Sequence, residues 1–347
     1  MIKDIRINKN RNNINGVFSI KDKKFFYKIL SLSDYENERS GYEIIKGMYP
    51  VANLIFKGII NNNKSGLLIY EFEETIGKNR GLLIDIFSNS NNYNTDSHLL
   101  NKILFIYKRA FMSSFKMTKS KTADIFFKDR IKTRLHKYYN KRFFKEVRNI
   151  KFNFLKHEID NVDFEKIIVS LGDFFDSKGK EYCVISQCDP NDLNIGTKPI
   201  VLDYLAGGYN PLMAEFAIIF WYCIAQGGYF SVIYNKKEYI NHPNIIKNID
   251  KVIFHKNKLM HKTNYKRKKF LINYIQEVID PLLKKTHNNF NWYEDFKNYL
   301  AMRIISVFDI SKMIEKDKLL SLAYLDLFYN HMNICKTTQL VEVIKKL

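Results

Sequence analysis

Two carboxylates and a carboxamide lie close together in residues 182–204, which read YCVISQCDPNDLNIGTKPIVLDY. Asp189 and Asn194 stand five residues apart in a polar loop, and Asp203 follows the next apolar run. Carboxylate and amide oxygens hold Mg²⁺ beside the phosphates of a nucleotide, and a further carboxylate can orient an attacking hydroxyl group. This spacing predicts a phosphoryl-transfer site.

The two apolar runs that flank the loop would hold these side chains in place. Tyr182–Ile185 and Pro199–Leu202 predict a β-hairpin with the carboxylates at its open end. The alternative is an ordinary surface turn rich in Asp and Asn, since both residue types favour turns.

The loop resembles the catalytic and metal-binding segment of the aminoglycoside phosphotransferase and choline kinase family, within the protein-kinase-like superfamily. The family pattern is His-Gly-Asp, four residues, Asn, an apolar strand and a second Asp. The resemblance implies that Asp189 is the catalytic aspartate and that Asn194 and Asp203 bind magnesium. Gln187 and Cys188 replace the histidine and glycine of the family. A glutamine can still brace the loop through hydrogen bonds.

An upstream segment adds a second set of candidates. Lys23–Leu30, KKFFYKIL, predicts a strand that contains Lys28. The segment after it resembles the helix of the family whose glutamate pairs with the strand lysine, and Glu38 takes that place. A lysine that contacts phosphates must be aimed, and a carboxylate can aim it. Glu36 and Glu43 are the alternative partners.

Two further segments are expected to contact a nucleotide. Ser65–Glu73 predicts a strand, and the resemblance implies a hinge at Glu71, Phe72 and Glu73 whose backbone binds the adenine edge. Asn12–Ser19 predicts a turn between two short strands that would cover the nucleotide, although it lacks a glycine-rich signature.

Composition sets the outer limits. The 347 residues are 46% hydrophobic, which is enough for a sizeable core. The most apolar segment, Met213–Ala225, is expected to be a helix shorter than the roughly 20 residues of a membrane span. The amino terminus lacks the apolar core of a signal peptide. The four cysteines have no Cys-x-x-Cys spacing and predict reduced thiols in the cytoplasm.

The formal charge of +20 favours a different class, the nucleic-acid-associated proteins. Basic and aromatic residues interleave in 116–145, and a second basic patch occupies Asn264–Lys269. We interpret the first as an amphipathic helical segment with its lysines outside, and the second as a solvated helix start. Nucleic acid is therefore an alternative partner rather than the expected one.

The resemblance implies an α+β, bilobed, protein-kinase-like fold. Residues 1–73 would form a small β-rich lobe, and residues 74–347 a larger, mainly helical lobe that contains the hairpin 182–204. Residues 98–178 and the chain after Asn210 are expected to be helical. Glu215 takes an acidic position that, in the family, supports the catalytic loop.

These expectations combine into an ATP- and Mg²⁺-dependent kinase that phosphorylates a hydroxyl of a small molecule, such as an aminoglycoside-like antibiotic, a sugar or an amino alcohol. A polycationic acceptor would need an acidic pocket, for which Glu294, Asp295, Asp309 and Glu315 are candidates; a neutral or anionic acceptor stays open. The alternatives are a non-catalytic nucleotide-binding module and a nucleic-acid-associated protein. No membrane association is expected.

Overall fold

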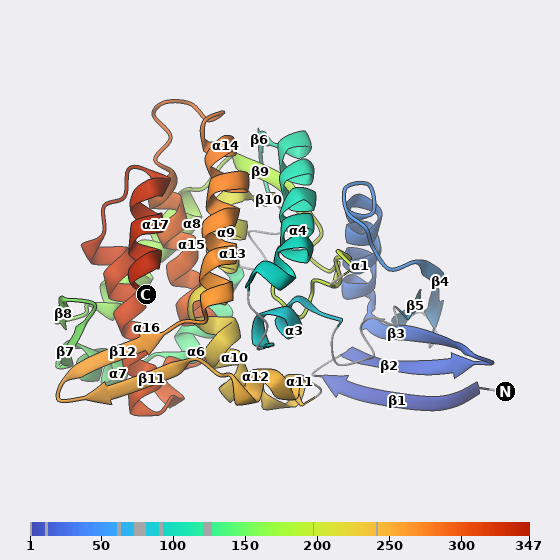
Figure 1. Ribbon diagram of the computed structural model, residues 1–347, viewed down its shortest axis with the longest axis horizontal. Helices are drawn as coiled ribbons and strands as arrows, with labels where there is room; N and C mark the ends of the chain where they lie inside the picture. Colours follow the sequence, from blue (N-terminus) through green and yellow to red (C-terminus); the bar gives the residue numbers. More distant parts are fainter. Residues whose placement is uncertain are drawn as a thin grey trace.

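An antiparallel sheet and one long helix form the first lobe, and a larger helical lobe follows it (Figure 1). The computed structural model describes residues 2–10, 13–60, 64–72, 81–89, 93–120, 127–196, 198–240 and 242–347. The first lobe is β-rich and the second mainly helical, as the sequence predicts.

The sheet of the first lobe has five strands in the order β1-β2-β3-β5-β4. Their bounds are β1 (Ile2–Asn10), β2 (Asn13–Ile20), β3 (Lys23–Ser31), β4 (Leu54–Ile60) and β5 (Ser65–Glu71). The turn predicted over Asn12–Ser19 is wrong, because most of that segment is strand β2, paired with β1 from Asn13 onward.

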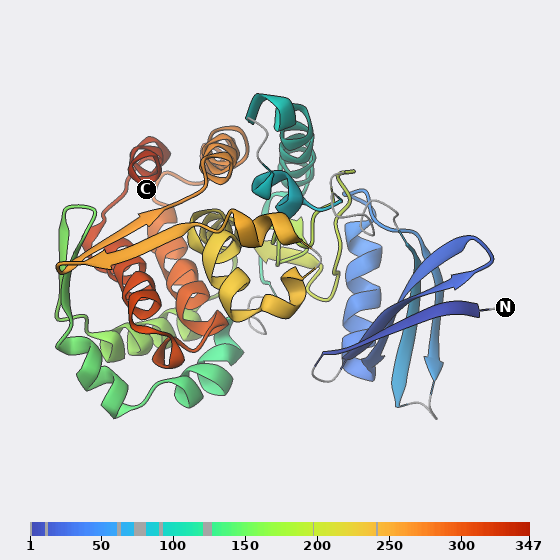
Figure 2. The same cartoon turned by 60° about the horizontal axis from the view of Figure 1, so that its bottom comes forward.

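Helix α1 (Leu32–Ile45) lies between this sheet and the second lobe (Figure 2). It begins where the Ser31 hydroxyl accepts a hydrogen bond from the Asp34 amide, a common helix N-cap. At Gly41 the helix backbone touches the second lobe: a Cβ atom there would lie 1.9 Å from the Tyr204 carbonyl oxygen. Only glycine fits this approach.

Strand β9 (Glu181–Ser186) forms the centre of the second lobe, buried along its whole length. It pairs with β6 (Lys116–Thr118) on one side and β10 (Gly208–Pro211) on the other. The predicted hairpin between 182–185 and 199–202 is therefore wrong. Pro199 has no amide hydrogen to donate, and the Gly196 amide bonds to the Ile200 carbonyl instead, which closes a tight loop.

The helices of the second lobe surround β9 (Figure 1). Their bounds are α3 (Leu83–Ser88), α4 (Tyr93–Ser114), η2 (Ile131–Leu135), α6 (His136–Tyr138), α7 (Lys141–Arg148), α8 (Phe164–Ser177), α9 (Leu212–Trp221), η3 (Tyr222–Phe230), α10 (Ser231–Tyr234), α11 (Lys236–Tyr239), α12 (Pro243–Lys247), α13 (Tyr265–Tyr274), η4 (Ile275–Ile279), α14 (Asp280–Leu283), α15 (Trp292–Val307), η5 (Ile310–Lys312), α16 (Glu315–Asp326), η6 (Leu327–His331) and α17 (Thr337–Lys346).

Two hairpins interrupt the regions predicted to be wholly helical. They are β7 (Lys151–Phe154) with β8 (His157–Asp160), and β11 (Lys251–His255) with β12 (Lys258–Lys262). Together they form a sheet in the order β11-β12-β7-β8. Each two-residue turn has both residues at positive φ, which suits the twist of a hairpin.

The most apolar helix is longer than predicted, because α9, η3 and α10 form one continuous helix from Leu212 to Tyr234. Its 23 residues could cross a membrane by length and composition, but 94% of its most apolar window is buried inside the protein. It serves here as the core helix of the second lobe. Gly227 lets it approach α13 closely, since a Cβ there would lie 2.5 Å from the Arg267 guanidinium.

Candidate active site

A cavity of about 710 Å³ lies between the two lobes, which is large enough for a nucleotide. Strands β2, β3 and β5 and helix α1 supply one wall, and residues around Asp203 supply the other. The lining residues are Ile14, Asn15, Phe26, Lys28, Leu30, Glu38, Ala52, Tyr70, Glu71, Phe72, Asn194, Leu202, Asp203, Tyr204, Leu205, Asn235 and Glu238.

Lys28 points into this cavity because side chains alternate along a strand. Phe26, Lys28 and Leu30 share one face of β3, and all three line the cavity. The Lys28 Nζ lies 2.6 Å from Glu38 Oε1 and 2.8 Å from Asp203 Oδ1. One ammonium group thus joins the sheet, helix α1 and the segment that follows the polar loop.

The structure distinguishes Glu38 from its two neighbours in α1. Glu38 is buried and faces Lys28, whereas Glu36 pairs with Arg39 on the surface and Glu43 pairs with Lys46 and Lys57. Because helix residues advance by about 100° each, these glutamates cannot all share the inner face. The predicted Lys28–Glu38 contact is present.

Electrostatics keep Lys28 charged. Burial acts to lower the pKa of Lys28, but the carboxylates of Asp203 and Glu38 outweigh it and raise that pKa. The positive charge of Lys28 in turn lowers the pKa of Asp203. Burial raises the pKa of Glu38, which also accepts a 3.4 Å hydrogen bond from Tyr70. Asp203 is therefore ionised at neutral pH and available to a cation.

The polar loop has a backbone conformation that explains one departure from the family pattern. Cys188 lies at the position of the family glycine and has φ +59°, in the left-handed region that glycine adopts at little cost. A side chain there costs about 1–3 kcal/mol. Asp203 is also left-handed, at φ +63°. Strained positions of this kind gather at functional sites.

Buried hydrogen bonds brace the loop. The Gln187 amide donates to the Asp189 carbonyl at 3.3 Å, and the Asn194 amide donates to the same oxygen at 3.1 Å. At the start of the loop, the Ser186 hydroxyl donates to Glu215 Oε1 at 2.5 Å. Gln187 thus braces the loop in this chain, and Glu215 lies where it supports the loop rather than entering the cavity.

The Asp189 carboxylate lies beyond the lining of the cavity, facing the second lobe. Its Oδ2 accepts a hydrogen bond of 2.9 Å from Asn191, and its Oδ1 pairs with the Arg303 guanidinium at 3.0 Å. Arg303 comes from α15, 114 residues later, and sequence reasoning missed it. A lone arginine in the apolar run Leu300–Ile305 was the available signal, since buried arginines need a partner.

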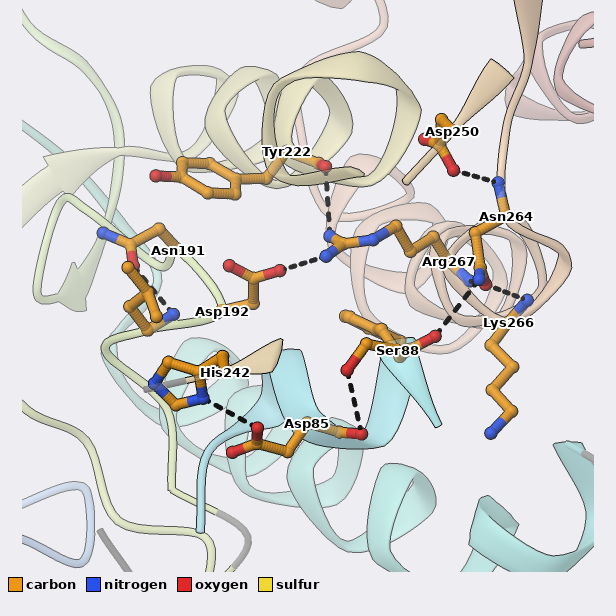
Figure 3. A network of polar contacts seen from close by, with 12 residues as sticks. Asp85, Ser88, Asn191, Asp192, Tyr222, His242, Asp250, Asn264, Lys266 and Arg267 are labelled. Atoms are coloured by element: carbon orange, nitrogen blue, oxygen red, sulfur yellow. Dashed lines mark hydrogen bonds and ion pairs between the residues drawn. The ribbon is translucent and has the colours of Figure 1, made fainter. Parts of the chain in front are cut away.

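A second arginine that sequence reasoning missed holds the loop from behind (Figure 3). Arg267 and Asp192 are both buried and form an ion pair of 2.5 Å. Arg267 also donates to the Tyr222 carbonyl at 3.3 Å and stacks on Phe87. The solvated helix start predicted for Asn264–Lys269 is therefore wrong for Lys266 and Arg267, which are buried. The helix start itself is correct, with Asn264 as the N-cap of α13.

The donor set fits a magnesium ion that is shared with phosphates. Asn194 and Asp203 both line the cavity and offer oxygen ligands. Across the described part of the chain, no group of three or more His, Cys, Asp or Glu side chains gathers to hold a metal by itself. Mg²⁺ beside a nucleotide usually takes one or two carboxylates and completes its shell with phosphates and water.

The predicted hinge lies at the edge of the cavity. Glu71 and Phe72 line it, and Glu73 lies outside the described residues. The amides of Glu71 and Phe72 already donate to the carbonyls of Asn53 and Lys24. Trp221, Tyr222 and Tyr229, considered as possible pocket residues, are buried in the core.

Comparisons with solved structures identify the architecture. The chain superposes on the apo form of a thermostable mutant of aminoglycoside phosphotransferase APH(4)-Ia with a TM-score of 0.50 and 8% identity, covering 99% of this chain and 95% of that one. Spectinomycin phosphotransferase APH(9)-Ia, in complex with ADP and spectinomycin, gives 0.47, 9% identity and coverage of 100% and 94%. A Plasmodium vivax ethanolamine kinase gives 0.44, 11% identity and coverage of 94% and 81%.

At these identities the likeness concerns the fold, and it confirms the predicted α+β, bilobed, kinase-like architecture. No protein-family model matches the sequence, and a search of curated proteins gives no match. The predicted roles of Asp189, Asn194 and Asp203 therefore depend on the geometry of the site.

Proposed function

We propose that this chain, built on the kinase-like fold, is an ATP- and Mg²⁺-dependent phosphotransferase that phosphorylates a hydroxyl group of a small molecule. One observation carries the proposal: Lys28, Glu38 and Asp203 meet at the interlobe cavity within 2.8 Å of one another through the Lys28 ammonium group. A lysine aimed by a helix carboxylate, opposite a metal-binding aspartate, is the arrangement that holds a nucleotide triphosphate for transfer.

The residues have distinct tasks in this proposal. Lys28 contacts the phosphates, and Glu38 fixes the direction of its ammonium group. Asn194 and Asp203 would hold the magnesium ion, which supplies charge stabilisation for the transferring phosphoryl group when it is bound. Asp189 orients the acceptor hydroxyl and takes its proton, a contribution of roughly 10²–10⁴-fold for a positioned base.

The chain after Asp203 supports a small acceptor. Protein kinases place an activation loop after the metal-binding aspartate. Here only residues 204–207 separate Asp203 from strand β10, and the buried helix α9 follows directly. This segment is too short to form a docking platform for a polypeptide.

The first test is nucleotide binding followed by turnover. Mg²⁺-ATP should raise the melting temperature of the wild-type protein, and labelled phosphate should pass from ATP into one member of a panel of hydroxylated metabolites and antibiotics. Lys28→Met should lose both responses. A protein that binds nucleic acid with steep salt dependence and ignores Mg²⁺-ATP would refute the proposal.

A further inference from the structure

The surroundings of Asp189 are cationic. Arg303 is buried, with 7% of its side chain exposed, and its guanidinium is aimed at the Asp189 carboxylate. Its Nε donates to Gln226 at 3.1 Å and one Nη2 hydrogen donates to Asp189. A guanidinium has five N–H donors in a planar fork, so these two bonds leave a fork edge for a second anion.

Two more arginines lie against the same helix. Arg134 donates to the carbonyl of Ser306 at 3.0 Å, three residues beyond Arg303 in α15. Arg130 lies one turn before Arg134, and residues four apart share a helix face. Arg130 therefore lies beside Arg303. Burial and the positive charges of Arg303 and Arg134 lower the pKa of Arg130 to about 9, so all three remain protonated at neutral pH.

The acidic residues that might have made a pocket for a polycation lie elsewhere. Asp295 pairs with Lys178, Glu294 with Lys297, and Asp309 with Lys312. Glu315 is exposed at the start of α16. In the part of the chain that the structure describes, Asp189 is the carboxylate paired with Arg303. An ammonium-rich acceptor would meet repulsion here.

We infer that the acceptor is an anionic hydroxylated small molecule, whose phosphate or carboxylate group binds the open fork of Arg303 beside Arg130. This inference rests on the proposed function, because it concerns the acceptor side of the same site. The anion of the acceptor compensates the cluster of guanidinium charges and places a hydroxyl next to Asp189. Bidentate recognition of phosphate and carboxylate is the characteristic use of arginine.

The transfer step balances as follows. The acceptor oxygen forms a bond to the γ-phosphorus, and the bond from that phosphorus to the β,γ-bridging oxygen breaks. The hydroxyl proton passes to the Asp189 carboxylate, and ADP leaves with the bridging oxygen. Asp189 can receive this proton because its two known hydrogen bonds occupy two of about four acceptor positions on a carboxylate.

The binding test uses inorganic phosphate as the probe. The protein is first saturated with Mg²⁺ and a non-hydrolysable ATP analogue, and phosphate is then titrated at constant ionic strength by calorimetry. We expect saturable binding that weakens at least tenfold in Arg303→Met and less in Arg303→Lys. Arg148→Met is the matched control, since Arg148 forms an exposed pair with Asp163. Equal phosphate binding by wild type and Arg303→Met, or no binding by the wild type, would overturn the inference.

The transfer test compares acceptors that share one skeleton and differ in charge. Glycerol 3-phosphate and glycerate are set against glycerol and 3-amino-1,2-propanediol, and glucose 6-phosphate and gluconate against glucose and glucosamine. We expect the anionic members to have the higher kcat/KM, and Arg303→Met to raise their KM. A preference for neutral or cationic members contradicts the inference while leaving the proposed function intact. Loss of the Mg²⁺-ATP melting shift in the wild type contradicts the proposed function instead.

Discussion

Lys28 and Asp203 form an ion pair of 2.8 Å across the interlobe cavity, although 175 residues separate them in the chain. The contact joins strand β3 of the first lobe to the segment that follows the polar loop. A nucleotide entering the cavity would meet both groups at once, the ammonium with its phosphates and the carboxylate with its metal ion. The pair is therefore a marker of the nucleotide-free arrangement of the site.

Removing the charge of Asp203 tests its role as a metal ligand. We expect Asp203→Asn to reduce Mg²⁺-dependent transfer by about 100-fold or more, since a bound metal contributes several kcal/mol to the transition state. Asp160→Asn, which changes an exposed aspartate of strand β8, should keep normal activity. Initial rates measured over a range of Mg²⁺ concentrations distinguish the two, and a near-normal rate for Asp203→Asn would exclude the assignment.

Glu38 is predicted to act by aiming Lys28. Glu38→Gln keeps the shape of the side chain but removes the charge that orients the ammonium group, so we expect kcat/KM for ATP to fall about 10–100-fold. Glu36→Gln alters a surface pair with Arg39 and should have little effect. If steady-state kinetics give the same loss for both variants, the contact has no special role.

The buried pair of Arg267 and Asp192 should stabilise the loop strongly. Replacing one partner leaves a buried charge alone, so Arg267→Met should lower the free energy of unfolding by about 3–5 kcal/mol. Adding Asp192→Asn should recover part of this loss. The surface pair of Arg148 and Asp163 should be worth less than about 1 kcal/mol. Urea unfolding of the two double-mutant cycles measures both, and equal coupling energies would contradict the prediction.

Glu215 predicts a pH dependence of stability. Burial raises the pKa of its carboxyl from 4.5 to about 8, so between these values the native state holds a proton that the unfolded state has lost. Stability therefore falls as pH rises through that window, by on the order of 1 kcal/mol per pH unit. Glu215→Gln should flatten this slope in urea unfolding between pH 5 and 8. The exposed Glu158→Gln should not change it, and an unchanged slope in Glu215→Gln would refute the assignment.

Cys188 predicts an unusual response to glycine. Cys188→Gly releases about 1 kcal/mol or more of left-handed strain, which offsets the lost burial of the thiol. Cys223 is equally buried but lies within a helix, where glycine costs about 1 kcal/mol more than alanine. Thermal unfolding should therefore show a much larger loss for Cys223→Gly than for Cys188→Gly. The reverse order would mean that Cys188 is unstrained.

The sequence was most informative where short segments carry both the pattern and the side chain. Lys28 lies in a strand whose alternation places it on the cavity face, and Asn194 follows the loop by a fixed short spacing. The contact of Lys28 with Glu38 spans only ten residues. Such relationships depend on local geometry, which a linear pattern records.

Contacts that depend on tertiary packing could not be predicted in the same way. Arg303 reaches Asp189 only because α15 packs against α9, and Arg267 reaches Asp192 only because Gly227 lets two helices meet closely. The hairpin of β7 and β8 was missed for a different reason. Its turn uses Leu155 and Lys156 at positive φ, residue types that rarely signal a hairpin.

The close packing of Gly41 in α1 against the Tyr204 carbonyl has a mechanical consequence. Gly207 is just as tight, because a Cβ there would lie 2.8 Å from the Gly41 Cα. Helix α1 is thus seated on the second lobe backbone to backbone, and a rigid rotation of the whole first lobe would break this seat. Opening of the cavity is then a swing of the sheet over a stationary α1, which draws Lys28 away from Glu38 and makes their separation a gauge of how far the enzyme has opened.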